Sequence, residues 1–150
     1  MLEPADSIRV VRVLQTPGQP VMAWVESAGS GRTARVAGKV IERQYRCGDR
    51  HLLLLTEGNP YEEALHVHYL DSELRLLDSI ELSAPYTAGV LDHVAVAAAN
   101  ALTFAFFNAH ERWRLEIADT PRWRLRGNAF PVRRKRPLFC KAWLVLEKEA

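Results

Sequence analysis

The sequence predicts an all-β fold, an antiparallel β-sandwich or barrel that is built from repeated hairpins. Short runs of alternating apolar and polar residues recur along the chain, separated by proline, glycine and small polar residues. This pattern is typical of strands and turns. In addition, the run 64–70 matches the run 101–107, and each is followed by a short polar break and a second apolar run. The match indicates two copies of one strand–turn–strand unit.

Length and composition predict a single domain over residues 1–150. A chain of this length can bury its own core, and 48% hydrophobic with 25% charged residues is ordinary for a folded protein. The longest apolar run, 94–107, is shorter than the roughly 20 residues of a transmembrane helix. The first residues do not resemble a secretory leader, and Cys47 and Cys140 lack metal-ligand spacing. We therefore expect a cytoplasmic protein without a cofactor or a membrane contact.

The first third of the chain predicts three strands, in the runs 7–14, 21–25 and 33–41. A proline- and glycine-rich turn and a serine- and glycine-rich loop separate them. Residues 43–50 are polar, and we expect a connection there. The run 51–55 is apolar throughout and predicts a buried strand.

The middle of the chain predicts two further hairpins. After the strand 64–70, an apolar face continues through 74–82, and Asp78 interrupts it, which indicates a bulge or a strand end. The segment 87–109 is rich in alanine and fits helical spacing, but its valines and phenylalanines alternate as in a strand. The match with 64–70 favours strand, and a helix is the alternative.

The C-terminal part predicts a hairpin over 112–126 with its turn at 119–121. Its apolar side chains alternate with charged ones; they are Trp113, Leu115, Ile117, Trp123 and Leu125. A three-residue loop would pair Leu115 with Leu125, turning both tryptophans to the core and the arginines to solvent. The last strand, 138–146, is apolar on both faces apart from Lys141, so we expect both to be covered, within the domain or by another subunit.

About ten to twelve short strands at this spacing are typical of a sandwich or a barrel. A propeller-blade-like array is the alternative, because a repeat of roughly 40 residues suits a blade. The chain is shorter than a ring of about four blades requires, so such an array would be incomplete or closed by another subunit.

One short motif points to metal chemistry. His66-Val67-His68, with Glu73 beyond it, resembles half of the cupin metal motif, without the glycines that flank that motif. His93 would supply a fourth ligand, and the resemblance implies a metal-dependent enzyme. However, the apolar residues of strand 64–70 lie on the face opposite the histidines. We therefore expect the histidines to point to solvent or to a neighbouring layer.

Basic residues gather near the C-terminus, although the net charge is only +2. They are Arg112, Arg114, Arg122, Arg124, Arg126, Arg133, Arg134, Lys135 and Arg136. Like charges at facing positions mildly destabilise a sheet. An arginine-covered face therefore predicts an anionic partner: phosphate, an acidic protein, or the acidic segment 57–81 of another subunit. A solvated face that discourages edge pairing is the alternative.

These observations predict a non-enzymatic protein-binding or assembly module, a subunit of a larger complex or a homo-oligomer. A nucleic-acid-binding protein that uses the arginine-rich face is one alternative. A cupin-like metal-dependent enzyme at His66, His68, Glu73 and His93 is another.

Overall fold

The computed structural model describes residues 1–59, 61–123, 131–134 and 141–149, and these form strands, turns and loops but no helix. The all-β prediction is confirmed. In chain order the strands are β1 Leu2–Pro4, β2 Ile8–Leu14, β3 Met22–Ser27, β4 Thr33–Ala37, β5 Val40–Cys47, β6 Arg50–Thr56, β7 Ala64–Leu70, β8 Leu76–Ser83, β9 Asp92–Ala98, β10 Ala101–Ala105, β11 Trp113–Arg122, β12 Val132–Arg134 and β13 Ala142–Lys148. None of the described residues forms a helix of the length and hydrophobicity that a membrane span requires.

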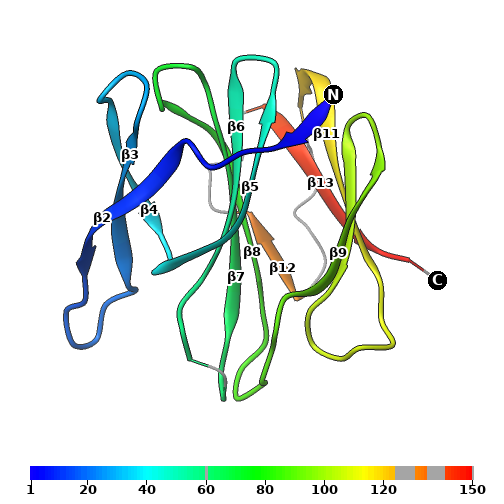
Figure 1. The fold of residues 1–150 in the computed structure, drawn as a ribbon. Coiled ribbons are helices and arrows are strands. Elements are labelled where there is room, and N and C mark those ends of the chain that lie inside the picture. The colour runs from blue at the N-terminus through cyan, green and yellow to red at the C-terminus, as the bar shows by residue number, and fades with distance from the viewer. Residues whose placement is uncertain (60, 124–130, 135–140, 150) are drawn as a thin grey trace.

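The strands form three antiparallel sheets that are stacked as three layers (Figure 1). The central sheet has the order β1-β5-β6-β7-β8-β12, the C-terminal sheet β13-β11-β10-β9, and the N-terminal sheet β2-β3-β4. This is a sandwich-like arrangement of stacked sheets, and the described strands do not close into a barrel.

The central sheet is buried on both faces, which explains its uninterrupted apolar strand. Leu52, Leu53, Leu54 and Leu55 of β6 are all inaccessible to solvent. Because successive side chains of a strand point to opposite faces, Leu52 and Leu54 join a core with the C-terminal sheet, while Leu53 and Leu55 join a core with the N-terminal sheet. A single strand therefore contributes to two hydrophobic cores.

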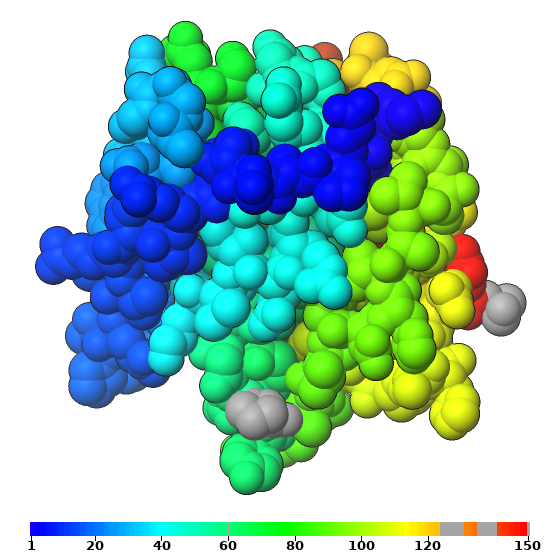
Figure 2. Space-filling model, viewed as in Figure 1, coloured from blue at the N-terminus to red at the C-terminus, as the bar shows by residue number. Residues whose placement is uncertain are grey.

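The chain before β2 links the three layers. Residues 1–8 cross the front of the central sheet (Figure 2). Along this path Leu2 N donates to Ala99 O at 2.8 Å, and Ala5 N donates to Gln44 O at 3.1 Å. The loop between β4 and β5 also packs closely on the central sheet: Gly38 has a φ of +116°, and a Cβ there would lie 2.7 Å from Leu55 Cβ.

The segment 87–109 contains the strands β9 and β10 and no helix, as the match with 64–70 predicted. β9 and β10 pair antiparallel, with Ala101 opposite Ala98. The helical alternative fails because alternate residues of β10, Leu102 and Phe104, fill the core between the central and C-terminal sheets. β7–β8 and β10–β11 are both hairpins; that they are copies of one unit stays a prediction.

The polar connection expected over 43–50 is wrong, because β5 continues to Cys47 and β6 begins at Arg50. β5 has only the three-residue β1 on its outer side. Arg43 and Arg46, which point to opposite faces of β5, are both exposed. Because these side chains are polar, the sequence pattern did not indicate a strand here.

The hairpin expected over 112–126 is also wrong. β11 runs through the predicted turn to Arg122, and Leu115 pairs with Leu102 on one side and Leu146 on the other. β10 and β13 therefore occupy both edges of β11, one of which the predicted hairpin assigned to the strand that contains Leu125. Leu125 itself lies outside the described residues. Trp113 is buried as predicted, but Trp123 is 62% exposed.

The last strand is fully covered on one face and partly covered on the other. Leu144 and Leu146 are buried in the core, whereas Trp143 and Val145 on the other face are partly exposed. Trp143 still has close neighbours, because the Arg50 guanidinium lies 4.4 Å from its ring centroid and Tyr69 lies beside it. Residues 138–140 lie outside the described chain.

A buried carboxylate joins β13 to the central sheet. The pairing of β7 with β8 shifts next to Asp78, which confirms the expected irregularity. Asp78 has no solvent exposure. Its Oδ2 accepts hydrogen bonds from Arg134 at 2.7 Å and from the main-chain N–H groups of Trp143 and Leu144 at 2.9 Å each. A buried charge with this many donors is a structural anchor.

We expect Asp78→Asn to lower the free energy of unfolding by about 3 kcal/mol, because it leaves the Arg134 guanidinium buried without its counter-ion. Chemical denaturation measures this change. Asp92→Asn removes the same charge from an exposed side chain of β9 and should cost less than about 0.5 kcal/mol. Equal losses in the two variants would contradict the anchoring role.

Candidate functional site

The two histidines of the HxH motif lie inside the protein. His66 and His68 point from β7 toward the N-terminal sheet, and each is 2% exposed. Their rings stack, with centroids 6.2 Å apart and an angle of 5° between the planes. The prediction that the histidines face a neighbouring layer is confirmed, and the alternative that they face solvent is wrong, because the N-terminal sheet covers this face of β7.

His68 has structural partners on both ring nitrogens. Its Nε2 lies 2.8 Å from the carbonyl oxygen of Ala37, and its Nδ1 lies 2.7 Å from Ser79 Oγ. A carbonyl can only accept, so Nε2 carries the proton and Nδ1 accepts from the serine hydroxyl. Burial, with a smaller contribution from neighbouring His66, lowers the pKa of His68 to about 4. The ring is therefore neutral at pH 7 and bridges the N-terminal and central sheets.

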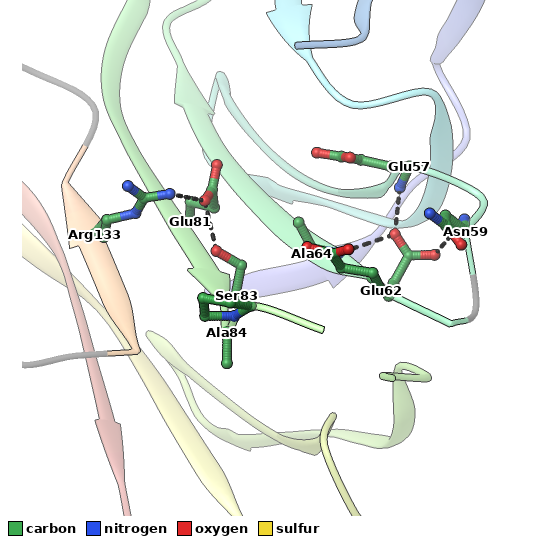
Figure 3. A pocket seen from close by; sticks show the side chains of 10 residues that line it. Glu57, Asn59, Glu62, Ala64, Glu81, Ser83, Ala84 and Arg133 are labelled. Atoms are coloured by element: carbon green, nitrogen blue, oxygen red, sulfur yellow. Dashed lines mark hydrogen bonds and ion pairs between the residues drawn. The ribbon is translucent and has the colours of Figure 1, made fainter. Parts of the chain in front are cut away.

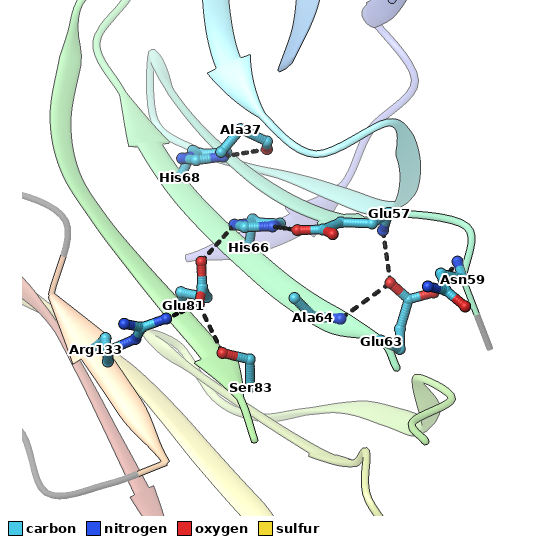
Figure 4. A network of polar contacts seen from close by, with 10 residues as sticks. All are labelled: Ala37, Glu57, Asn59, Glu63, Ala64, His66, His68, Glu81, Ser83 and Arg133. Carbon is cyan, nitrogen blue, oxygen red and sulfur yellow. Dashed lines mark hydrogen bonds and ion pairs between the residues drawn. The ribbon is translucent and has the colours of Figure 1, made fainter. Parts of the chain in front are cut away.

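His66 lies between two carboxylates (Figure 4). Its Nε2 donates to Glu57 Oε2 at 2.7 Å. Its Nδ1 lies 3.6 Å from Glu81 Oε1 and has no hydrogen-bond partner among the described residues. A buried ring nitrogen without a hydrogen bond is uncommon in folded proteins. The Nδ1 atom of His66 is directed toward Glu81, which is one of the carboxylates that line a cavity.

The acidic cavity has a volume of about 540 Å³ and lies at the start of β7 and the end of β8 (Figure 3). It is lined by Glu57, Asn59, Glu62, Glu63, Ala64, Glu81, Ser83, Ala84, Pro85 and Arg133. Four carboxylates face a single guanidinium, so the lining is negative. A concave site with one sign of charge concentrates ligands of the opposite sign.

The four carboxylates have different roles. Glu63 is buried, and its oxygens accept from the main-chain N–H groups of Glu57, Asn59 and Ala64, which fixes the loop between β6 and β7. Glu81 accepts from Ser83 Oγ at 2.6 Å and from Arg133 at 3.1 Å. Glu62 is exposed, and the side chain of Glu57 is 30% exposed. Glu57 and Glu62 therefore present charge to an incoming ligand.

The residues of the cupin-like hypothesis are not brought together. Glu73 forms an ion pair with Arg75 in the exposed turn between β7 and β8. His93 lies on β9 of the C-terminal sheet, beside Asp92 and across the central sheet from His66 and His68. Within the described ranges, no three His, Cys, Asp or Glu side chains are arranged to hold a metal ion.

The predicted arginine face is divided among different surroundings. Arg114 pairs with Glu116 at 2.8 Å, Arg133 with Glu81, and Arg134 with Asp78. Arg112 and Arg122 are exposed. Arg124, Arg126, Lys135 and Arg136 lie outside the described residues. The acidic segment 57–81 thus meets basic residues of its own chain, because β12 pairs with β8.

Sequence reasoning did not identify the acidic cavity, although Glu57, Glu62 and Glu63 lie close together around one turn. Their clustering was the available signal. Pairing of β7 with β8, which places Glu81 opposite His66, completes the site.

The comparisons with known proteins add no relative: no protein-family model matches the chain, and neither do any curated proteins or solved structures.

The buried state of His68 predicts acid sensitivity. The folded protein keeps His68 neutral down to about pH 4, whereas the unfolded chain takes up the proton near pH 6.5. The free energy of unfolding should therefore fall as pH drops from about 6.5 to about 4, by about 2 kcal/mol from this residue. Urea unfolding at pH 7 and pH 4.5 measures the fall, and His68→Asn should reduce it.

His110→Gln is the matched control, since His110 is an exposed loop histidine and its replacement should leave the acid dependence unchanged. If His68→Asn loses as much stability on acidification as the unaltered chain, His68 does not carry the pH dependence.

Proposed function

We propose that the protein is a non-enzymatic binding module, a subunit of a larger complex, which receives a positively charged segment of a partner protein in the acidic cavity. The observation that supports this proposal most strongly is the composition of that cavity, four glutamates and one arginine around about 540 Å³. Its volume falls within the usual range of ligand sites, roughly 300–1,000 Å³, and would accommodate one or two lysine or arginine side chains.

The buried ring of His66 is a second, independent reason. Its Nδ1 has no hydrogen-bond partner among the described residues, and it faces Glu81 at the cavity wall. Buried polar atoms are normally satisfied by protein, water or ligand. A cationic donor that binds Glu81 from the cavity side would polarise the contact between Glu81 and the His66 ring.

Arg133 makes the cavity selective rather than merely acidic. Its guanidinium holds Glu81 from the β12 side, and its side chain is 66% exposed. A partner segment with a carboxylate or a phosphate next to its basic residue would therefore meet both signs of charge. A segment with basic residues alone would depend on Glu57 and Glu62.

A binding titration tests the proposal on the intact chain. A fluorescein-labelled peptide of alternating lysine and alanine should bind with an affinity that falls as salt rises, because the contact is electrostatic. The double variant Glu57→Gln/Glu62→Gln should weaken this binding at least tenfold, measured by fluorescence anisotropy.

The matched control is Glu3→Gln/Glu73→Gln, which removes the same charge from exposed positions outside the cavity lining. It should change the affinity less than twofold. An equal loss in both double variants, or equal binding of a glutamate–alanine peptide, would contradict the proposal.

A further inference from the structure

The outer face of the N-terminal sheet carries a basic and aromatic surface of its own. β2, β3 and β4 lie at one side of the stack (Figure 1), and no other sheet of the described residues covers their outer face. The inner face packs on the central sheet through Ile8, Val25 and Val36. The residues that alternate with these therefore face solvent.

The strand register places one tryptophan between two arginines on that face. Arg12 of β2 is opposite Trp24 of β3, and Trp24 is opposite Arg35 of β4. Directly opposed residues share a face and have Cβ atoms about 5 Å apart. The indole is therefore flanked by a guanidinium side chain on each neighbouring strand.

The surface is positive, with little internal compensation. Arg12 and Arg35 are exposed, and no acidic side chain in the described parts of the chain forms an ion pair with either. Glu26, the acid on this face, pairs with Arg9 at 2.8 Å. The next row holds the apolar side chains of Leu14 and Met22. Trp24 itself is only partly buried.

Basic and aromatic groups on one open surface are what single-stranded nucleic acid requires. Arginines contact the backbone phosphates, and an aromatic ring offers a platform on which a base stacks without regard to its identity. The bases of a single strand are available for stacking, whereas those of a duplex are stacked on each other.

We propose that the outer face of β2–β4 binds single-stranded nucleic acid, with a base stacked on Trp24 and phosphates held by Arg12 and Arg35. This site is distinct from the acidic cavity and from the C-terminal arginines. Trp113 of the C-terminal sheet is buried, and the arginines Arg114 on β11 and Arg133 and Arg134 on β12 of the central sheet are already paired with acids. The strand should follow the row Arg12–Trp24–Arg35 across the sheet.

Fluorescence anisotropy with a labelled oligothymidylate of about 12 nucleotides tests the proposal on the intact chain. Binding should be saturable at low salt and should weaken as salt rises. Arg12→Gln/Arg35→Gln should weaken binding at least tenfold and flatten the dependence of log affinity on log salt by about 1.4, since each lost phosphate contact contributes about 0.7. Trp24→Leu should weaken binding about tenfold with an unchanged salt slope.

Two control variants separate this face from the alternatives. Arg114→Gln and Trp123→Leu alter a basic and an exposed aromatic residue of the C-terminal region and should each change the affinity less than twofold. Circular dichroism verifies that each variant keeps its β-sheet signal and melting temperature.

Three results would overturn the proposal. The first is no saturable binding of the oligonucleotide at low salt, and the second is an equal loss of affinity in the control variants. The third is a dimer of the intact chain, seen by light scattering, that Arg12→Gln/Arg35→Gln dissociates without any effect on nucleic acid binding. That last result would assign the face to a second copy of the chain instead.

Discussion

Strand β7 is buried on both of its faces, and the rest of the structure follows from this constraint. A buried strand with polar side chains must satisfy them inside the protein, because unpaired polar groups are costly away from water. His68 meets this requirement through Ala37 and Ser79, which also fastens the N-terminal sheet to the central one. His66 meets it in part, through Glu57. The other ring nitrogen of His66, Nδ1, has no hydrogen-bond partner among the described residues and faces Glu81 at the wall of the acidic cavity.

The separation of charge along the sequence is largely resolved within the fold. β12 pairs with β8 and brings basic residues from the C-terminal part to its acidic side chains, where Arg133 pairs with Glu81 and Arg134 with Asp78. Among the described residues, regions of both signs remain, including the cavity at Glu57 and Glu62 and the outer face at Arg12 and Arg35. The cavity lies at the loop between β6 and β7, whereas Arg12 and Arg35 lie on the N-terminal sheet, so the two proposed sites do not share residues.

Much of the fold could be predicted from local patterns, and the failures have physical causes. The match between 64–70 and 101–107 correctly favoured strand over helix in 87–109. The hairpin over 112–126 failed because alternation specifies which face a residue takes but not which strand it pairs with. The histidines were misplaced in part because nothing local reveals that a third sheet covers their face. The cavity required the pairing of β7 with β8, which no short segment specifies.

Hydrogen–deuterium exchange tests most directly the claim that the central sheet is enclosed on both sides. Amides of β6 and β7 should exchange only through global unfolding, whereas those of the edge strand β9 should exchange through local opening. The exchange free energy of β6 and β7 should then equal the free energy of unfolding from denaturant titration. Exchange of β7 amides as fast as those of β9 would show that one face of the sheet is open to solvent, and would contradict the account.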